Sequence, residues 1–248
     1  MKKVFRFTMA VLPLALLLAA PAGAQVNPKE EGITREQANQ ILEELRNIRQ
    51  LLEKQNKPQT PPGPTMAKLN MQGAEMLGSK DAPITMVEFT DYQCPFCQRF
   101  HTTVFTELKK NYIDTGKVRF YSRDLPLDSL HPNAIRAAQA ARCASEQGQY
   151  WKLRDVMGAN PNNLDLDSLV ADAAGLKMDT AKFRSCVESE KYKQAVQTDV
   201  LEAMKIGADG TPTFVIGKST PEGVDGEVLV GAMPYEVFER KLKTLETK

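Results

Sequence analysis

The sequence carries no excess of charge of either sign. Its 248 residues hold 32 Lys and Arg against 31 Asp and Glu. It also lacks internal repeats, runs of like charges and, beyond residue 24, any apolar segment long enough to cross a membrane. A near-neutral balance argues against a protein that binds nucleic acid through its net charge. We therefore expect no nucleic-acid partner.

Histidine and cysteine, which often bind metals, are scarce. The chain has two histidines, His101 and His131, and four cysteines. Cys94 and Cys97 lie close together, but a zinc site would need a second pair of ligands at suitable spacing, and the other two cysteines are isolated. The sequence predicts no metal site and no cofactor other than a redox-active disulfide between Cys94 and Cys97.

The first residues have the three parts of an export signal. Met1–Arg6 is basic, residues 8–20 are apolar, and Ala22-Gly23-Ala24 is a small-residue cleavage site, so residues 1–24 are interpreted as a cleaved signal peptide. An uncleaved anchor is the alternative, but the apolar run is short and contains Pro13. We expect the protein in the periplasm or cell envelope of a bacterium, where disulfides are stable.

Residues 25–57 contain a helix candidate. Thr34 and Gln37 have the spacing of a capping box. Apolar residues then recur three and four positions apart, as in a coiled-coil seam: Ala38, Ile41, Leu45, Ile48 and Leu52. Such a short helix needs a partner surface, either the chain's own domain or another copy of the chain. The proline-rich linker at residues 58–65 would hold it away from the domain, so we expect a homo-oligomer formed through residues 34–55.

The remaining chain, residues 66–248, is predicted to be an α/β domain. The strand candidates are runs rich in β-formers, at residues 84–90, 118–122, 213–216 and 228–230. The helix candidates are residues 94–111, a helical block between 132 and 206, and residues 234–245. The predicted order is β-α-β, a helical block, then β-β-α.

The motif Cys94-Pro95-Phe96-Cys97 lies where the first of these strands gives way to a helix. The N–H groups at a helix N-terminus are unpaired and carry partial positive charge, so they stabilise a thiolate. Cys94 would attack a substrate disulfide, and Cys97, deeper in the helix and less exposed, would resolve the mixed disulfide. Half of a zinc site and a strained structural disulfide are the alternatives.

Residues 78–97 read Gly-Ser-Lys-Asp-Ala-Pro-Ile-Thr-Met-Val-Glu-Phe-Thr-Asp-Tyr-Gln-Cys-Pro-Phe-Cys. This segment resembles the opening of the DsbA-like family of exported disulfide oxidoreductases. Thr211-Pro212-Thr213-Phe214 resembles the second signature of that family. The resemblance covers residues 66–248. It implies a thioredoxin fold with a helical insertion at about residues 125–206.

The resemblance also implies a substrate site. Pro212 would follow a cis peptide bond that faces the cysteine pair, and the backbone of Thr211 would pair with an extended substrate. Pro95 and Phe96 are likewise assigned to substrate binding. No histidine lies between the cysteines, as it does in strong oxidases of this family, so we expect a less extreme pKa for Cys94 and a less oxidising protein.

Glu88 is implied to be a catalytic acid buried beneath the cysteines. Burial in an apolar strand should raise the pKa of its carboxyl. Glu88 could then exchange a proton with Cys97 as that thiol leaves or attacks. A glutamate that points to solvent at the strand end is the alternative.

The other two cysteines, Cys143 and Cys186, lie in the predicted helical block. Neither has a neighbouring cysteine or a strand-to-helix setting. We expect them to form a structural disulfide, with two buried free thiols as the alternative.

These features predict an enzyme that forms or reshuffles disulfides in unfolded or misfolded exported proteins. The resemblance implies a membrane redox partner of the Dsb type that recharges it. The direction of the reaction, oxidation or isomerisation, stays open at this point. The alternative function is an oligomeric, chaperone-like binding protein of the cell envelope with little redox turnover.

Overall fold

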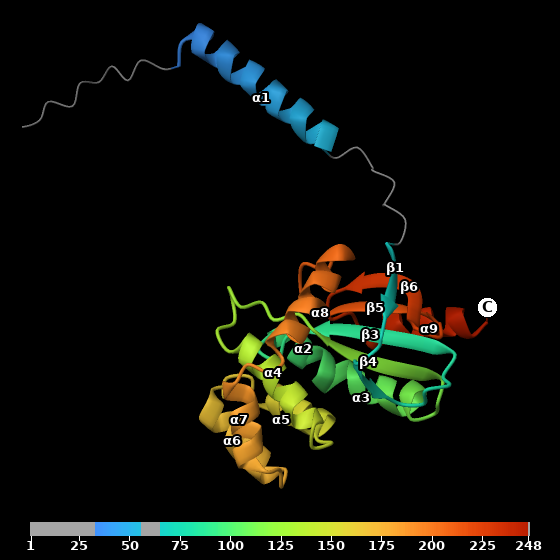
Figure 1. Ribbon diagram of the computed structural model, residues 1–248. Coiled ribbons are helices and arrows are strands. Elements are labelled where there is room, and N and C mark those ends of the chain that lie inside the picture. Colours follow the sequence, from blue (N-terminus) through green and yellow to red (C-terminus); the bar gives the residue numbers. More distant parts are fainter. Residues whose placement is uncertain (1–32, 56–64, 248) are drawn as a thin grey trace, which may run out of the picture. The chain divides into compact units, whose positions relative to one another are not determined.

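The computed structural model describes residues 33–55 and 65–247. These ranges fall into two units, an N-terminal helix and a globular domain (Figure 1). The expected signal peptide, residues 1–24, and all of the expected linker except Thr65 lie outside the described residues. Among the helices that are described, none has both the length and the apolar character needed to cross a membrane.

The N-terminal unit is one helix, α1 (Arg35–Gln55), in the predicted position. It begins with the predicted capping box. The backbone N–H of Gln37 donates to the Thr34 hydroxyl (3.2 Å), and the N–H of Thr34 donates to the Gln37 side chain (3.0 Å). Four large apolar side chains along the helix are 48–56% exposed, namely Ile41, Leu42, Leu45 and Ile48.

A six-stranded mixed sheet forms the centre of the globular domain, in the order β1-β6-β5-β3-β4-β2. The strands are β1 (Met66–Asn70), β2 (Glu75–Leu77), β3 (Ile84–Thr90), β4 (Val118–Asp124), β5 (Thr213–Ser219) and β6 (Gly223–Val230). The fully buried β3 pairs parallel with β4 and antiparallel with β5. The predicted α/β thioredoxin fold is confirmed, with two additional edge strands, β1 and β2, that the sequence analysis missed.

β5 and β6 extend beyond the predicted strands because glycine permits their close approach. Gly217 pairs with Gly226 across the two strands. A Cβ atom on Gly217 would lie 2.0 Å from the carbonyl oxygen of Asp225, and one on Gly226 would lie 2.5 Å from the backbone of Ile216. These two glycines are therefore what allows this part of the sheet to form.

One continuous helical segment follows β3. It comprises α2 (Pro95–Phe100), the π-helical turn η1 (His101–Phe105), α3 (Thr106–Leu108) and a second π-helical turn, η2 (Lys109–Ile113). The helical insertion between β4 and β5 contains α4 (Ala134–Ser145), α5 (Tyr150–Ala159), α6 (Leu166–Gly175), α7 (Thr180–Glu188) and α8 (Lys193–Lys205). After β6 comes α9 (Tyr235–Glu246). In Figure 1, α4 to α7 gather at one end of the sheet.

Buried apolar side chains join these layers. One face of the sheet packs against α9 and the helical segment that follows β3. There the ring of Phe214 lies 4.6 Å from that of Phe100 and 4.9 Å from that of Phe238. The opposite face packs against α8, where Phe89 and Ala203 belong to one buried group. A third group fills the helical insertion.

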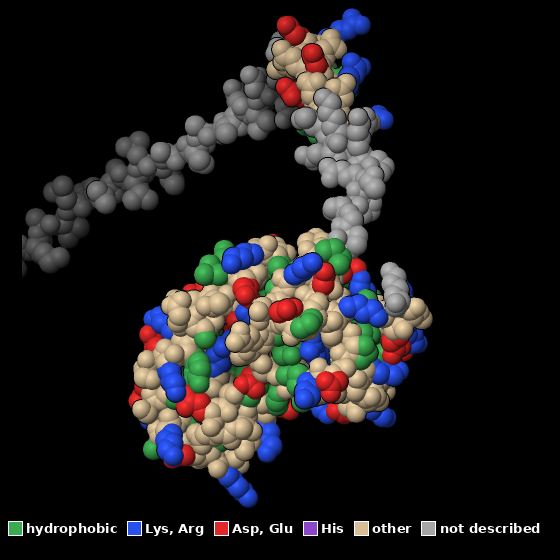
Figure 2. Space-filling model, turned by 45° about the vertical axis from the view of Figure 1, so that its right-hand side comes forward, with side chains coloured by type: hydrophobic (Ala, Val, Ile, Leu, Met, Phe, Trp, Pro, Cys, Tyr) green, Lys and Arg blue, Asp and Glu red, His purple; other side chains and the backbone are tan. Residues whose placement is uncertain are grey.

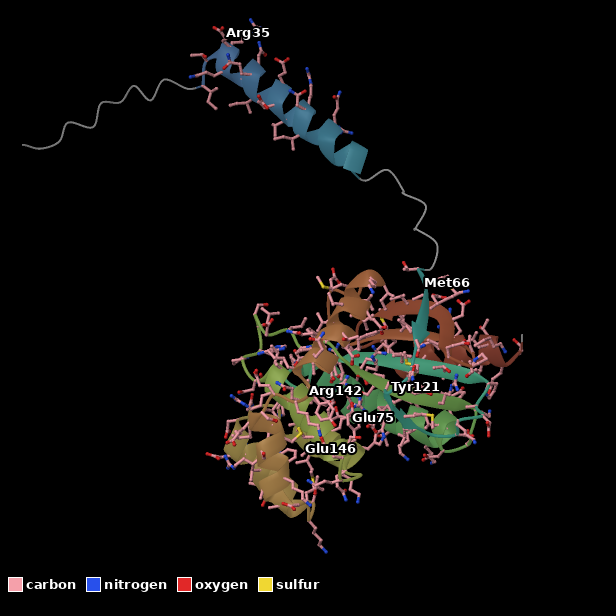
Figure 3. The ribbon with its side chains drawn as sticks, in the orientation of Figure 1. Arg35, Met66, Glu75, Tyr121, Arg142 and Glu146 are labelled. Carbon is pink, nitrogen blue, oxygen red and sulfur yellow. A yellow bond between two sulfur atoms is a disulfide. The ribbon has the colours of Figure 1, made fainter. Side chains whose placement is uncertain are left out.

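Buried charges also attach the insertion to the sheet. Arg142 of α4, labelled in Figure 3, donates to Asp124 at the end of β4 (2.6 Å) and to Asp199 of α8. Arg123 of β4 donates to Asp199 (2.6 Å) and to Glu202. Because a buried charge is costly without a partner, this network fixes how α4 and α8 lie on β4.

Cys143 of α4 and Cys186 of α7 form a disulfide, which is the pairing that the sequence analysis expects. Glu146, labelled in Figure 3, lies at the end of α4 and accepts hydrogen bonds from Lys191 (2.7 Å) and Tyr192 (2.8 Å). The disulfide and these polar contacts join α4 to α7 and to the segment before α8.

Replacing both cysteines, Cys143→Ala with Cys186→Ala, should lower the free energy of unfolding. The two residues are 43 apart in sequence, and closing such a loop stabilises by about 4 kcal/mol in the chain-entropy account. Urea denaturation of the oxidised wild type and of the double variant measures the difference. A loss below about 1 kcal/mol would show that this crosslink contributes little to stability.

Candidate active site

Cys94 and Cys97 lie at the start of α2, immediately beyond the carboxyl end of the central strand β3. Cys94 is the N-cap residue, with extended backbone angles (φ −70°, ψ 122°), and Pro95 occupies the first helical turn. Proline is well suited to that turn because the N–H that it lacks would have no partner within the helix. Cys94 and Cys97 are both free thiols and both buried, at 3% and 2% exposed, so the expected difference in exposure is small.

The Thr211–Pro212 peptide bond lies beside Cys94 and is cis. β5 begins at Thr213 and runs antiparallel to β3, pairing Thr213 with Phe89, so the residues before β5 meet the end of β3. The Sγ of Cys94 accordingly lies 3.4 Å from the carbonyl oxygen of Thr211. The topology thus brings together two motifs that are more than a hundred residues apart in sequence.

The two thiols have opposite pKa shifts. The hydrogen bond from the Cys97 thiol is the largest influence that lowers the pKa of Cys94, to about 5. Thr211 and the backbone N–H groups of Phe96 and Cys97 add to it, against burial. Burial raises the pKa of Cys97 well above its ordinary value, and its hydrogen bond to Cys94 and the charge of Glu88 raise it further. At neutral pH Cys94 is the thiolate and Cys97 the thiol.

Alkylation of Cys94 by iodoacetamide in the reduced protein should follow a titration with a midpoint near pH 5. Only the thiolate reacts, so the rate should fall as the pH drops through 5. Because folding lowers this pKa, the ionised thiol also stabilises the reduced folded state. That stabilisation is fully present above the ordinary pKa of 9.0 and is lost as the pH falls through 5. Mass spectrometry identifies the modified cysteine, and a midpoint above pH 8 would contradict the assignment.

Glu88 lies on the face of β3 that packs against α2. Ile84, Met86 and Glu88 alternate along the strand, and the first two belong to the buried group that includes Phe100. Glu88 is fully buried, so the alternative of a solvent-facing side chain is wrong. The Nε2 atom of His101 lies 2.9 and 3.0 Å from its two carboxylate oxygens.

The expected rise in the pKa of Glu88 is also wrong. Burial does raise it, but the charges of His101 and Arg154 and their hydrogen bonds lower it more, so the net shift is downward. Glu88 is therefore an ionised carboxylate at neutral pH. The apolar strand around Glu88 gives no sign of the two partners that other elements supply.

His101 and Arg154 are the site residues that the sequence analysis missed. His101 follows Cys97 by four residues and so lies on the same face of the helix, a spacing that was available as a signal. Arg154 comes from α5 and has no local signature. Its guanidinium donates to Glu88 and lies 5.1–5.5 Å from the centres of three aromatic rings, those of Phe105, Phe120 and Trp151.

A cavity of about 310 Å³ adjoins these groups. Cys97, His101 and Arg154 are among the residues that line it, together with Asp155 and Lys109. In the part of the chain that the structure describes, no group of three or more His, Cys, Asp or Glu side chains is arranged to hold a metal ion.

The segment that precedes Cys94 is attached to the start of the insertion. A carboxylate oxygen of Asp91 lies 2.8 Å from Nδ1 of His131. The side chain of Gln93 accepts a hydrogen bond from the backbone N–H of Asn133 (2.6 Å). His131 thus resembles His101 in pairing with a carboxylate, and although its partner Asp91 lines the cavity, His131 itself does not.

The surface beside Cys94 is partly apolar. Pro95 and Phe96, the residues assigned to substrate binding, are both exposed, and Phe96 is 53% exposed. The guanidinium of Arg99 lies 5.2 Å from the ring of Phe96. On the face of the domain that Figure 2 shows, basic and acidic side chains are interspersed, in keeping with the near-neutral composition.

Comparison with known proteins places the chain in a family. A family model described as Thioredoxin matches residues 71–229, more than half of the chain. The chain belongs to this thioredoxin family. The match includes the cysteine motif, the helical insertion and the cis-proline.

Two curated relatives of different lengths match this thioredoxin domain. The probable disulfide bond formation protein D of Bacillus anthracis is 29% identical over 150 residues, which cover 57% of this chain and 69% of that protein. The Na⁺/H⁺ antiporter NhaA 3 of Salinispora tropica is 34% identical over 139 residues, 56% of this chain. The chain spans only about a fifth (21%) of the antiporter's length.

Solved structures match over most of the domain. α-DsbA1 of Wolbachia pipientis is 27% identical with a TM-score of 0.64, covering 71% of this chain and 92% of that protein. BdbD of Bacillus subtilis, in its oxidised form, has a TM-score of 0.67 at 20% identity, covering 75% of this chain and 99% of that protein, and supports the fold alone. The chain is therefore a DsbA-like member of the thioredoxin superfamily with the fold of a thiol–disulfide oxidoreductase.

Proposed function

We propose that this chain is a thiol–disulfide oxidoreductase that acts on exported proteins through Cys94 and Cys97. The observation that carries the proposal is the opposite ionisation of the two thiols, with the pKa of Cys94 lowered to about 5 and that of Cys97 raised. Cys94 is thus suited to attack a disulfide and to leave as a thiolate, and Cys97 is suited to resolve the mixed disulfide.

In the oxidising direction, a substrate thiolate attacks the Sγ of Cys94 in the Cys94–Cys97 disulfide. Cys97 leaves with the electron pair and takes up a proton. A second substrate thiolate then attacks the substrate sulfur of the mixed disulfide, and Cys94 leaves as a thiolate, which its low pKa favours. The substrate has lost two electrons and the protein has gained them.

The cis Thr211–Pro212 segment and the exposed Phe96 support a peptide site beside Cys94. The carbonyl of Thr211 lies next to the sulfur, where it can accept a hydrogen bond from an extended substrate backbone. The proposed substrates are unfolded or misfolded proteins in the periplasm or cell envelope. A membrane protein of the Dsb type would return the reduced protein to its oxidised form.

Self-association through α1 is the second part of the proposal. Its support is the exposed apolar stripe of Ile41, Leu42, Leu45 and Ile48 on a capped helix. A homo-oligomer would present several cysteine sites to one misfolded client, which favours reshuffling. Sedimentation of the mature chain should give an oligomer that Leu45→Asp dissociates, whereas Asn47→Asp on the opposite helix face should not.

The deciding experiment compares mature protein with a version that lacks residues 25–64. Both are incubated with scrambled ribonuclease and, separately, with reduced ribonuclease. Reactivation of scrambled ribonuclease that is lost on truncation would identify an oligomeric isomerase. Brisk oxidation of reduced ribonuclease by both versions, without reactivation, would identify an oxidase. Absence of both activities in the mature protein would overturn the proposed function.

A further inference from the structure

The reaction requires a proton to reach and leave Cys97, a thiol that is almost entirely buried. Cys97 is 2% exposed, and it must release its proton when it attacks the mixed disulfide and regain one when it leaves. Glu88 is fully buried, so it could not by itself pass a proton on to solvent, and its carboxylate is already occupied by contacts with His101 and Arg154. Some other group near Cys97 must connect it to solvent.

His101 has the right position for this connection. It lies four residues after Cys97 on the same helical segment, and both side chains line the cavity of about 310 Å³. Since a water molecule occupies about 30 Å³ in the liquid, the cavity has room for several. The His101 side chain is 21% exposed whereas that of Glu88 is fully buried, so the histidine spans the boundary between the buried carboxylate and solvent.

We propose that His101 transfers the proton between Cys97 and solvent through water in this cavity, while Glu88 and Arg154 hold its ring in place. This inference rests on the proposed oxidoreductase function. As Cys97 attacks the Sγ of Cys94 in a mixed disulfide, its thiol proton passes by way of water to the imidazole and then to bulk solvent. The substrate sulfur departs with the electron pair of the broken S–S bond.

The charges around His101 suit a group that is neutral at rest and briefly protonated. Burial and the charge of Arg154 lower its pKa, against the opposing effects of Glu88 and Asp155. The ionisable groups that face it or line the same cavity are Glu88 of β3, Arg154 and Asp155 of α5, Cys97 of α2, Lys109 of η2, and Asp91 and Tyr92 of the segment between β3 and α2. The Glu88 carboxylate would stabilise the transient imidazolium, as a buried carboxylate does in other imidazole-based proton transfers.

The test uses the full mature chain and oxidised glutathione as the probe. Rapid mixing resolves two steps, attack by the Cys94 thiolate and release of glutathione by Cys97. His101→Gln should slow the second step by about a hundredfold or more, the usual size of a general acid–base contribution. It should leave the first step and the Cys94 alkylation profile unchanged. Added imidazole should accelerate His101→Ala but not the wild type.

His131→Gln is the matched control, because it removes the other carboxylate-paired histidine, whose partner Asp91 lines the cavity but which does not line it itself. It should keep the pH profile of the glutathione-release step, whatever its effect on the absolute rate. A His101→Gln protein that resolves within twofold of the wild-type rate, with the same pH profile, would overturn the inference. If the wild type itself fails to react with oxidised glutathione, the proposed function fails instead.

Discussion

Replacing the attacking thiol, Cys94→Ser, should reduce the oxidation of reduced ribonuclease to the uncatalysed background. A serine hydroxyl is not ionised at neutral pH, and the low pKa of the Cys94 thiol is the property that makes this position reactive. Loss of the nucleophile in covalent enzymes lowers turnover by roughly a thousandfold or more. Recovery of ribonuclease activity over time measures the effect.

The matched control is the Cys143→Ala, Cys186→Ala double variant. It removes the same kind of side chain from the helical insertion, where the two cysteines already form a disulfide. At a temperature at which it remains folded, it should oxidise ribonuclease at the wild-type rate. If Cys94→Ser retained activity and the double variant lost it, the redox chemistry would take place at Cys143 and Cys186 instead of at Cys94 and Cys97.

Arg154→Met should destabilise the folded protein by about 3–5 kcal/mol at neutral pH, the usual cost of removing one partner of a buried ion pair. Glu88 would keep its buried charge but lose the guanidinium beside it. Folding lowers the pKa of Glu88, so the wild type has this electrostatic stabilisation above the ordinary value of 4.5. It loses the stabilisation as the pH falls below that value. Urea denaturation at several pH values measures both effects.

Two further variants separate the ion pair from simple packing. Arg184→Met removes an exposed arginine that pairs with Asp167, and it should change stability little. Adding Glu88→Gln to Arg154→Met should recover part of the lost stability, because the uncompensated charge is then absent. A loss below about 1 kcal/mol for Arg154→Met would mean that the pair contributes little.

The sequence predicts the local parts of this molecule well. The central strand at residues 84–90 and the helix at residues 35–55 occur where the hydrophobic pattern and capping box indicate them. The strand and helix candidates on either side of the cysteine motif also correctly place it at a strand-to-helix junction. These features depend on neighbouring residues, which is the information that a single sequence contains.

Features that depend on distant contacts were harder to predict. The edge strands β1 and β2 are short, and β6 contains glycines whose purpose is visible only once β5 lies beside it. The ionisation of Glu88 depends on Arg154, which is 66 residues away in sequence and reaches it from the helical insertion. A buried carboxylate requires a counter-charge, but the sequence alone does not say which arginine supplies it.

The central claim is that Cys94 is the cysteine that bonds to substrate and Cys97 the one that resolves the bond. The direct measurement is to incubate Cys97→Ser with scrambled ribonuclease and to map the trapped complex by mass spectrometry without reduction. The account predicts a mixed disulfide between Cys94 and ribonuclease, absent from Cys94→Ser. A complex that forms through Cys143 or Cys186, or no complex at all under conditions in which the wild type is active, would contradict it.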